Sequence, residues 1–279
     1  MIYHYTTIDS LESILNSGSL KFNKLTNLDD MAEFESFEGP FNPNEYLFVS
    51  SWSKDPDENI TLWNCYTDNK VGVRIELEDM PFPFFFPSSP WLKLNQDAQS
   101  GEIPWLLLPI DQALTKEYFM LSFYYIKEDF EKQVVYLSDE ELKDKYCTYA
   151  SKSYDLNTNS VNLHSEELAG WKNKIWESQK EFRFVLTILP QDPKFHNPNG
   201  STFIKDYNKG ILEMISKRAK NNIEYFLLKL RKDAVANMKV VLSPYAKESD
   251  SNRVVEILRH FHIPLSQYST SKLRIQYKK

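Results

Sequence analysis

The sequence has few glycines, few cysteines and no cluster of histidines. Its seven glycines form neither a Rossmann nor a Walker pattern, so a dinucleotide or triphosphate held by a glycine-rich loop is not expected. The two cysteines, Cys65 and Cys147, are too few for a disulfide framework or a cysteine zinc site. Of five histidines, only His260 and His262 are close, at a spacing that suits a strand face. No metal is expected, and side chains and strand backbone would have to hold any nucleotide.

Long apolar runs are also missing. The most apolar run, residues 80–86, is short and interrupted by proline, so no membrane partner is expected. Met1 is followed at once by Ile2, Tyr3 and His4 without a basic segment, which gives no sign of a secretory signal. Together these absences predict a reducing, cytoplasmic setting.

What is present indicates a globular protein with an uneven charge distribution. The 279 residues are 42% hydrophobic and 14% aromatic, enough to bury a sizeable core. Residues 201–279 hold 16 Lys and Arg against 7 Asp and Glu, although the whole chain has a net charge of −6. The favoured explanation is a solvated basic surface, and the alternative is a surface for an anionic partner such as nucleic acid.

Helical and strand patterns are mixed without a strict alternation, which predicts an α+β fold. The first part of the chain predicts a strand over 1–5, a helix over 8–17 ending at Gly18, a strand over 46–52, a helix over 59–66 and a strand over 71–77. Later patterns predict strands within 118–126 and 133–137, a helix from Ser138, a loop over 154–160, a helix over 207–221, strands over 224–230 and 238–242, a helix over 249–261 and a strand over 273–277.

The segment 171–187 organises these elements. Its second half, FRFVLTI from Phe182, is typical of a buried strand. Alternation assigns side chains to two faces: Gln179, Glu181 and Arg183 on one, and Lys180, Phe182 and Phe184 on the other. The rings favour a core and the polar face favours a cleft. The alternative is a half-exposed strand with a charge pair of little energetic weight.

Three segments carry a resemblance to a known family: YHYTT at 3–7, the stretch from FVSSWS to LWNCY at 48–66, and WESQKEFR at 176–183. Together with Ser-Gly-x-Leu at 17–20 and Gly-Val at 72–73, they resemble the bacterial domain-of-unknown-function family 2971. The last motif of that family is a lysine, a gap and E-x-E-x-R. Lys172, Glu181 and Arg183 match it, and Gln179 replaces the first glutamate.

That family is itself similar to the His-Tyr-Glu class of the ADP-ribosyltransferase-like fold. The resemblance implies one such α+β domain over residues 1–279, with split mixed or antiparallel sheets and surrounding helices. Residues 80–170 would be a large insertion or a variable region. NAD is the implied substrate.

The resemblance also implies residue roles. By position, His4 holds a ribose hydroxyl, Tyr66 stacks on nicotinamide, Glu181 is the catalytic carboxylate and Gln179 orients the acceptor. The other implied NAD-binding residues are Tyr5, Thr6, Ser50, Ser51, Ser53, Trp63, Lys172 and Arg183. Among these, Lys172 or Arg183 would meet the pyrophosphate as a cation, or Arg183 would instead tether Glu181.

The expected chemistry needs neither a metal nor a glycine loop. Cleavage of the nicotinamide–ribose bond builds oxocarbenium character, which a fixed carboxylate stabilises while a flat ring orients the leaving group. Each residue also has an ordinary structural explanation. His4 alone would be a hydrogen-bonded strand histidine, and Trp63 and Tyr66 would be core. Burial is expected for Cys65, which disfavours it as a nucleophile.

The sequence therefore predicts an NAD-dependent ADP-ribosyltransferase-like enzyme with an unknown protein or nucleic-acid acceptor, in a bacterial defence or toxin setting. One alternative is a non-catalytic nucleotide- or partner-binding module with the same cleft. A second is a nucleic-acid-processing enzyme that uses the basic C-terminal part.

Overall fold

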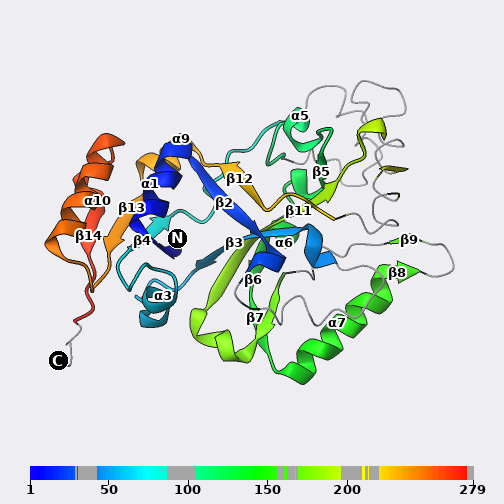
Figure 1. The fold of residues 1–279 in the computed structure, drawn as a ribbon, viewed down its shortest axis with the longest axis horizontal. Coiled ribbons are helices and arrows are strands. Elements are labelled where there is room, and N and C mark those ends of the chain that lie inside the picture. Colours follow the sequence, from blue (N-terminus) through cyan, green and yellow to red (C-terminus); the bar gives the residue numbers. More distant parts are fainter. Residues whose placement is uncertain are drawn as a thin grey trace.

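The computed structural model describes residues 1–28, 30, 43–86, 105–155, 160–161, 167, 169–195, 209–210, 213 and 220–274. The fold is α+β, as the sequence predicts, and is built on a ten-stranded, mostly antiparallel sheet (Figure 1). Helix α10 (Glu248–His260) and strand β14 (Tyr268–Thr270) lie at one end of the molecule. Helix α7 (Asp139–Ser153) lies at the other end, next to the short strands β8 (Tyr154–Asp155) and β9 (Ser160–Val161).

The chain starts with β1 (Ile2–Thr6), α1 (Ile8–Ser17) and β2 (Ser19–Lys24). Thr7 caps α1 by accepting a hydrogen bond from the backbone N of Ser10 at 3.1 Å. Gly18 ends the helix in the left-handed conformation, at φ 57°, which glycine adopts without a steric penalty. The predicted apolar stripe is buried, so the predicted helix is confirmed.

The main sheet runs in the order β12–β2–β3–β1–β4–β13–β14, with β11 pairing the other edge of β3. Its further strands are β3 (Leu47–Ser53), β4 (Val73–Leu77), β11 (Glu181–Pro190), β12 (Tyr225–Lys229) and β13 (Lys239–Leu242). Of the pairs along this path, only β13–β14 is parallel in the described residues. Strands β5 (Tyr118–Met120) and β6 (Glu131–Gln133) pair with β11.

Shorter elements surround this sheet. They are η1 (Leu25–Asn27), η2 (Pro43–Tyr46), α3 (Ile60–Cys65), α5 (Ile110–Ala113), η3 (Leu121–Phe123), α6 (Lys127–Phe130), β7 (Val135–Leu137), β10 (Trp171–Asn173), η5 (Lys174–Gln179), η6 (Pro193–Phe195), α9 (Lys232–Ala236) and η7 (Leu265–Gln267). Strand β10 pairs with β7 in parallel, and β8 pairs with β9.

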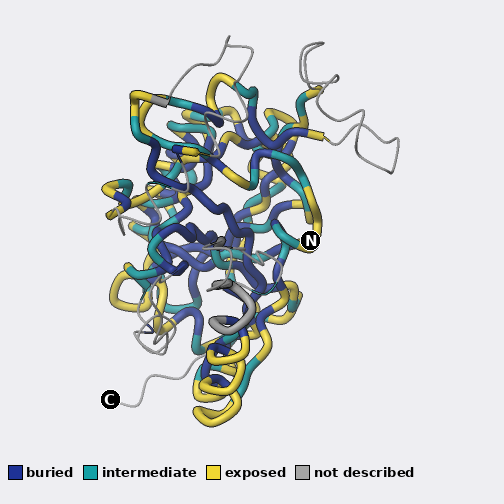
Figure 2. Tube along the Cα trace, turned by 90° about the vertical axis from the view of Figure 1, so that its right-hand side faces the viewer, coloured by how far each residue is buried: buried dark blue, intermediate teal, exposed yellow. Residues whose placement is uncertain are grey.

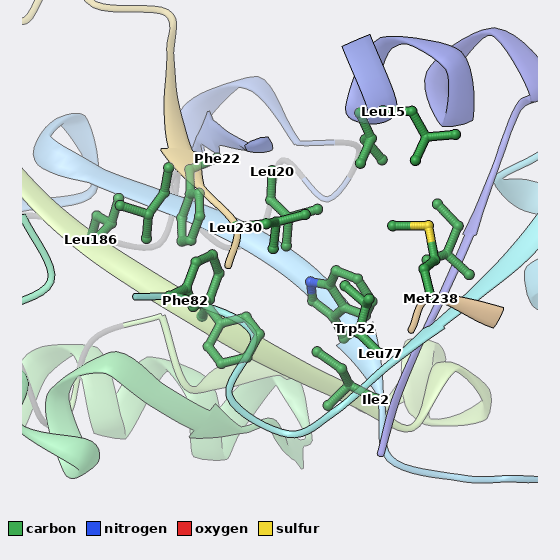
Figure 3. Close-up of a cluster of buried hydrophobic side chains, with 14 of the residues drawn as sticks. Ile2, Leu15, Leu20, Phe22, Trp52, Leu77, Phe82, Leu186, Leu230 and Met238 are labelled. Carbon is green, nitrogen blue, oxygen red and sulfur yellow. The ribbon is translucent and has the colours of Figure 1, made fainter. Parts of the chain in front are cut away.

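The first residues of β11 separate the main apolar core on one face of the sheet from a polar cluster on the other. Phe182 and Phe184 join the main core, which also contains Trp52 and the buried stripe of α1. Glu181 and Arg183 point to the opposite face, as alternation predicts, and form an ion pair there. Figure 3 shows Trp52 within this core, and Figure 2 shows the buried positions in the middle of the molecule with the exposed ones outside.

Three of the predicted elements and one predicted strand boundary need correction. The prediction of a strand over 273–277 is wrong at Leu273 and Arg274, because neither residue is in a strand. Residues 275–279 lie outside the described residues. The strand within 118–126 is only β5, because a 3₁₀ turn follows it. The loop over 154–160 begins and ends in the paired strands β8 and β9. Most of the helix over 207–221 lies outside the described residues, although positions 209–210 and 213 are helical.

The strand boundary at Glu181 is the fourth correction. Gln179 and Lys180 precede β11 instead of belonging to it. Gln179 ends η5, and Lys180 adopts a left-handed conformation at φ 47°. Alternation along a strand therefore does not fix where the Gln179 side chain points.

Candidate functional site

The main sheet is open between β1 and β2. Strand β2 pairs with β3 at Phe48 and Val49, and β1 pairs with β3 at Ser53. Residues 50–52, between those points, pair with β11 on the other edge of β3. The opening arises because β1 continues beside β4 while β2 continues beside β12. A cavity of about 500 Å³ lies here, a size typical of small-molecule sites.

Residues from both faces of the sheet line this cavity. Helix α1 contributes Ser10, Ser13 and Ile14, and it packs on the apolar face. Leu62 of α3 and the following Tyr66 line the cavity from the polar face. On that face, the Tyr5 ring packs edge-on against Trp63, with centroids 4.8 Å apart. The cavity therefore passes through the sheet, from the side of α1 to the side of α3.

His4 bridges the opening from β1 to β3. Its Nδ1 lies 2.8 Å from the carbonyl oxygen of Ser51. Because a carbonyl only accepts, Nδ1 carries the proton, and Nε2 is left as an acceptor in the neutral ring. Burial lowers the pKa of His4, while the hydrogen bond to Ser51 opposes that shift. The ring also packs on Trp52 at a centroid distance of 4.9 Å. A neutral His4 suits a ligand hydroxyl that donates a hydrogen bond.

Glu181 is a buried carboxylate held by two cations. Arg183 donates from Nε to Oε1 at 2.7 Å and from Nη2 to Oε2 at 3.1 Å. Lys172 donates from Nζ to Oε2 at 3.0 Å. Burial raises the pKa of Glu181, but the charges of Arg183 and Lys172, with hydrogen bonds from Arg183 and Ser51, lower the pKa to about 2. At neutral pH, Glu181 is therefore an anion and a hydrogen-bond acceptor.

Gln179 connects this carboxylate cluster to Tyr66. Lys172 Nζ donates to Gln179 Oε1 at 2.9 Å, which orients the amide. The amide Nε2 then donates to the hydroxyl of Tyr66 at 2.7 Å. The two hydrogen bonds fix the Tyr66 ring relative to Glu181, and all of the groups involved except Lys172 line the cavity.

The structure brings together most of the residues that the sequence singles out. The predicted residues that line the cavity are His4, Tyr5, Thr6, Ser50, Ser51, Tyr66, Gln179 and Glu181. Four others lie behind its wall. Trp63 is fully buried and donates to Glu58 at 3.2 Å, so its ordinary explanation as core is correct. Ser53 is buried and accepts from the backbone N of Asp55 at 3.1 Å.

Lys172 and Arg183 are the other two residues behind the wall. Lys172 is 5% exposed and Arg183 is 0% exposed, and both bind Glu181. A pyrophosphate cannot reach a guanidinium that is fully enclosed by protein. The interpretation of Arg183 as a tether for Glu181 therefore fits the structure, and the interpretation of these two residues as pyrophosphate cations does not.

Cys65 is exposed, which corrects the predicted burial. Leu62 and Trp63 form the buried side of α3, and at 3.6 residues per turn Cys65 lies on nearly the opposite side of the helix from Trp63. In the part of the chain that the structure describes, no group of three or more His, Cys, Asp or Glu is placed to hold a metal ion. No helix among the described residues is long and apolar enough to cross a membrane.

Sequence reasoning missed the part of the cavity wall formed by β2. Lys21 and Asn23 line the cavity there, with Ser10 and Ser13 of α1. The available signal was the alternation in SLKFNK, which places Lys21 and Asn23 on one face opposite Leu20 and Phe22.

The described basic residues of the C-terminal part are partly neutralised by neighbours. Arg231 pairs with Glu78 and, at 3.1 Å, with Asp233. Arg253 pairs with Asp9 and, at 3.7 Å, with Glu12. Two of the described basic residues of this part are thus paired with carboxylates, and the solvated basic surface stays a prediction.

Comparison of the chain with protein-family models, with curated proteins and with solved structures found no match. The resemblance to a family therefore rests on the sequence motifs alone.

Proposed function

We propose that this chain cleaves the nicotinamide–ribose bond of NAD and transfers ADP-ribose to a protein or nucleic-acid acceptor. The observation that carries the proposal is that His4, Tyr66 and Glu181, from distant parts of the chain, line one cavity at an opening of the sheet. The α+β architecture with this opened sheet supports an ADP-ribosyltransferase-like fold for the domain.

In this proposal each residue has a role that follows from its surroundings. The neutral imidazole of His4 accepts a hydrogen bond from a ribose hydroxyl. The ring of Tyr66, held through Gln179, stacks on the nicotinamide. Glu181 faces the nicotinamide ribose as an anion. Nicotinamide leaves with the bonding electron pair, the anomeric carbon gains positive charge, and the carboxylate stabilises that charge. A nucleophilic atom of the acceptor then bonds to this carbon and loses its proton.

The test is release of labelled nicotinamide from NAD in the presence of cell extract. Glu181→Ala removes the charge that stabilises the transition state, so we expect nicotinamide release to fall by on the order of 10²- to 10³-fold. Glu177→Ala is the matched control, since Glu177 is an exposed carboxylate on the adjacent η5. Equal release by the wild type and Glu181→Ala would show that Glu181 is not the catalytic group.

One observation favours a second candidate, a non-catalytic module that binds NAD or ADP-ribose. A carboxylate has about four lone-pair sites. Arg183 occupies two of these sites on Glu181, and Lys172 occupies a third. A carboxylate that already accepts three hydrogen bonds from two buried cations suits a structural role, in which it holds the cavity wall together. This candidate predicts calorimetric binding of ADP-ribose without nicotinamide release, even when Glu181 is intact.

A further inference from the structure

The cavity carries a cation that does not belong to the Glu181 cluster. Lys21 on β2 is the only Lys or Arg among the described residues that line the cavity. Its Nζ lies 4.8 Å from the centroid of the Tyr225 ring on the neighbouring strand β12. This contact with a ring face leaves the ammonium N–H groups available as donors to a ligand. Within the described part of the chain, no carboxylate pairs with Lys21.

Asn23 adds a neutral donor on the same strand, and Ser10 adds a hydroxyl that lines the cavity from α1. Asn23 follows Lys21 at two residues along β2, so both side chains leave the same face of the strand. The Asn23 amide makes no side-chain hydrogen bond to another described residue, although it lines the cavity. The Ser10 hydroxyl accepts from Thr7 at 2.9 Å, which leaves its own proton for a ligand. Ammonium, amide and hydroxyl donors together suit the oxygens of a phosphate or diphosphate.

The position of these donors relative to Glu181 fits a two-part ligand. Glu181 pairs with β3 at Ser53, where β1 begins to pair, and β2 pairs with β3 at Val49. Lys21 lies two residues before Asn23 and is therefore level with Ser51, whereas Glu181 is on β11 at the other edge of β3. The two residues therefore reach the cavity from opposite edges of β3. In a dinucleotide, the diphosphate is one ribose away from the carbon that bears nicotinamide. With the nicotinamide ribose beside Glu181, the diphosphate would lie across residues 50–52, on the side of Lys21.

We infer that the β2 end of the cavity binds the diphosphate of the dinucleotide, with Lys21 as its counter-ion and Asn23 as a hydrogen-bond donor. This inference rests on the proposed function for the identity of the ligand. It replaces Lys172 and Arg183, which are buried and bound to Glu181, as the cations expected near the diphosphate.

The test is calorimetric titration of ADP-ribose into the full chain. Lys21→Met removes a charged hydrogen-bond donor, so we expect the affinity for ADP-ribose to fall by on the order of tenfold to a hundredfold. Lys21→Arg keeps the charge and should retain most of the affinity. Lys239→Met is the matched control, because Lys239 is an exposed lysine on β13 outside the cavity. The wild-type affinity should also weaken with added salt more steeply than that of Lys21→Met.

Two outcomes would overturn the inference. In one, Lys21→Met binds ADP-ribose as tightly as the wild type does; in the other, the wild type does not bind ADP-ribose at all. The nicotinamide assay keeps the two proposals apart. If ADP-ribose binding depends on Lys21 but no nicotinamide is released, the diphosphate site stands and the catalytic proposal fails. If nicotinamide is released through Glu181 and Lys21→Met binds normally, only the diphosphate site fails.

Discussion

Glu181 takes its two cations from different parts of the chain. Arg183 lies two residues further along the same strand, so alternation alone places it beside Glu181. Lys172 comes from β10, whose position depends on its pairing with β7 and on the turn of η5. The first contact is a local property of the sequence, and the second is a property of the tertiary structure.

The pH dependence of stability should report this ion cluster. The folded-state pKa of Glu181 is about 2, below the ordinary value of 4.5. Its contribution to the free energy of unfolding is therefore present above pH 4.5 and is lost as pH falls from about 4.5 toward 2. The shift corresponds to roughly 3 kcal/mol. We expect the stability difference between the wild type and Glu181→Gln to shrink by about this amount between pH 6 and pH 2.

Urea unfolding at several pH values measures this difference. Because many carboxylates titrate in the same range, only the difference between the two proteins is informative. Parallel pH profiles for the wild type and Glu181→Gln would contradict the pKa assigned to Glu181.

Residue positions near a chain reversal were the least predictable. The faces of Glu181, Arg183, Phe182 and Phe184 follow from strand alternation. Gln179 reaches the cavity by a different route, because the left-handed Lys180 reverses the chain between η5 and β11. The sequence offers no alternation signal across such a turn, so the hydrogen bond from Gln179 to Tyr66 could not be predicted.

At the scale of elements, Gly72 sits where β4 first meets β1. A Cβ at this position would lie 2.3 Å from the carbonyl oxygen of Thr6 and 2.7 Å from the Thr67 side chain. Backbone cannot move aside as a flexible side chain can. Gly72 therefore sets how closely β4 approaches the end of β1, two residues after His4.

Gly72→Ala should destabilise the protein by about 1–3 kcal/mol, since overpacking forces the two strands apart. Gly170→Ala is the matched control, because a Cβ there has no neighbour closer than the Glu167 carbonyl oxygen at 4.0 Å. Thermal unfolding of the two variants makes the comparison. A melting temperature of Gly72→Ala at or above that of Gly170→Ala would show that the contact relaxes without cost.

Elements with local start and stop signals were predictable, and those that depend on a partner were not. Helix α1 has an N-cap, a buried stripe and a C-cap glycine within one short segment. Strand β14 is a polar Tyr-Ser-Thr segment that forms only by parallel pairing with β13. Its sequence contains no apolar alternation, which is why the last strand was placed too late in the chain.

At the scale of the whole molecule, the segment after β14 returns to α3. The Glu58 carboxylate accepts from Trp63 Nε1 at 3.2 Å, from the Ser271 hydroxyl at 2.5 Å and from the backbone N of Lys272 at 2.8 Å. Glu58 thus joins two parts of the chain that are distant in sequence. These hydrogen bonds contribute roughly 1 kcal/mol each.

Glu58→Ala should release this segment while the rest of the fold persists, because local opening needs less free energy than global unfolding. We expect trypsin to cleave after Lys272 about tenfold faster in this variant, as followed by mass spectrometry. Glu256→Ala, which removes an exposed carboxylate on α10, should cleave at the wild-type rate. An unchanged rate in Glu58→Ala would mean that other contacts hold the segment.

The topology was not predictable from periodicity. Alternation finds strands but does not say which strands pair. Strand β11 pairs with β3 over the positions from Glu181–Ser53 to Thr187–Leu47, although the two strands are far apart in the sequence. The opening between β1 and β2 depends on their separate partners, β4 and β12. The fold class, most individual elements and many of the cavity-lining residues were therefore accessible from the sequence, but the opening of the sheet that forms the cavity was not.

The pairing of β3 with β11 also has a consequence for synthesis on the ribosome. The imidazole and the serines of the cavity are translated within the first fifty-one residues, but the carboxylate follows only with β11, which ends at Pro190. Until β11 has left the ribosome and paired with β3, a nascent chain contains His4 and the serines of the cavity but not Glu181. Premature termination anywhere before β11 thus yields a fragment without Glu181, and under the proposed function such a fragment cannot cleave NAD.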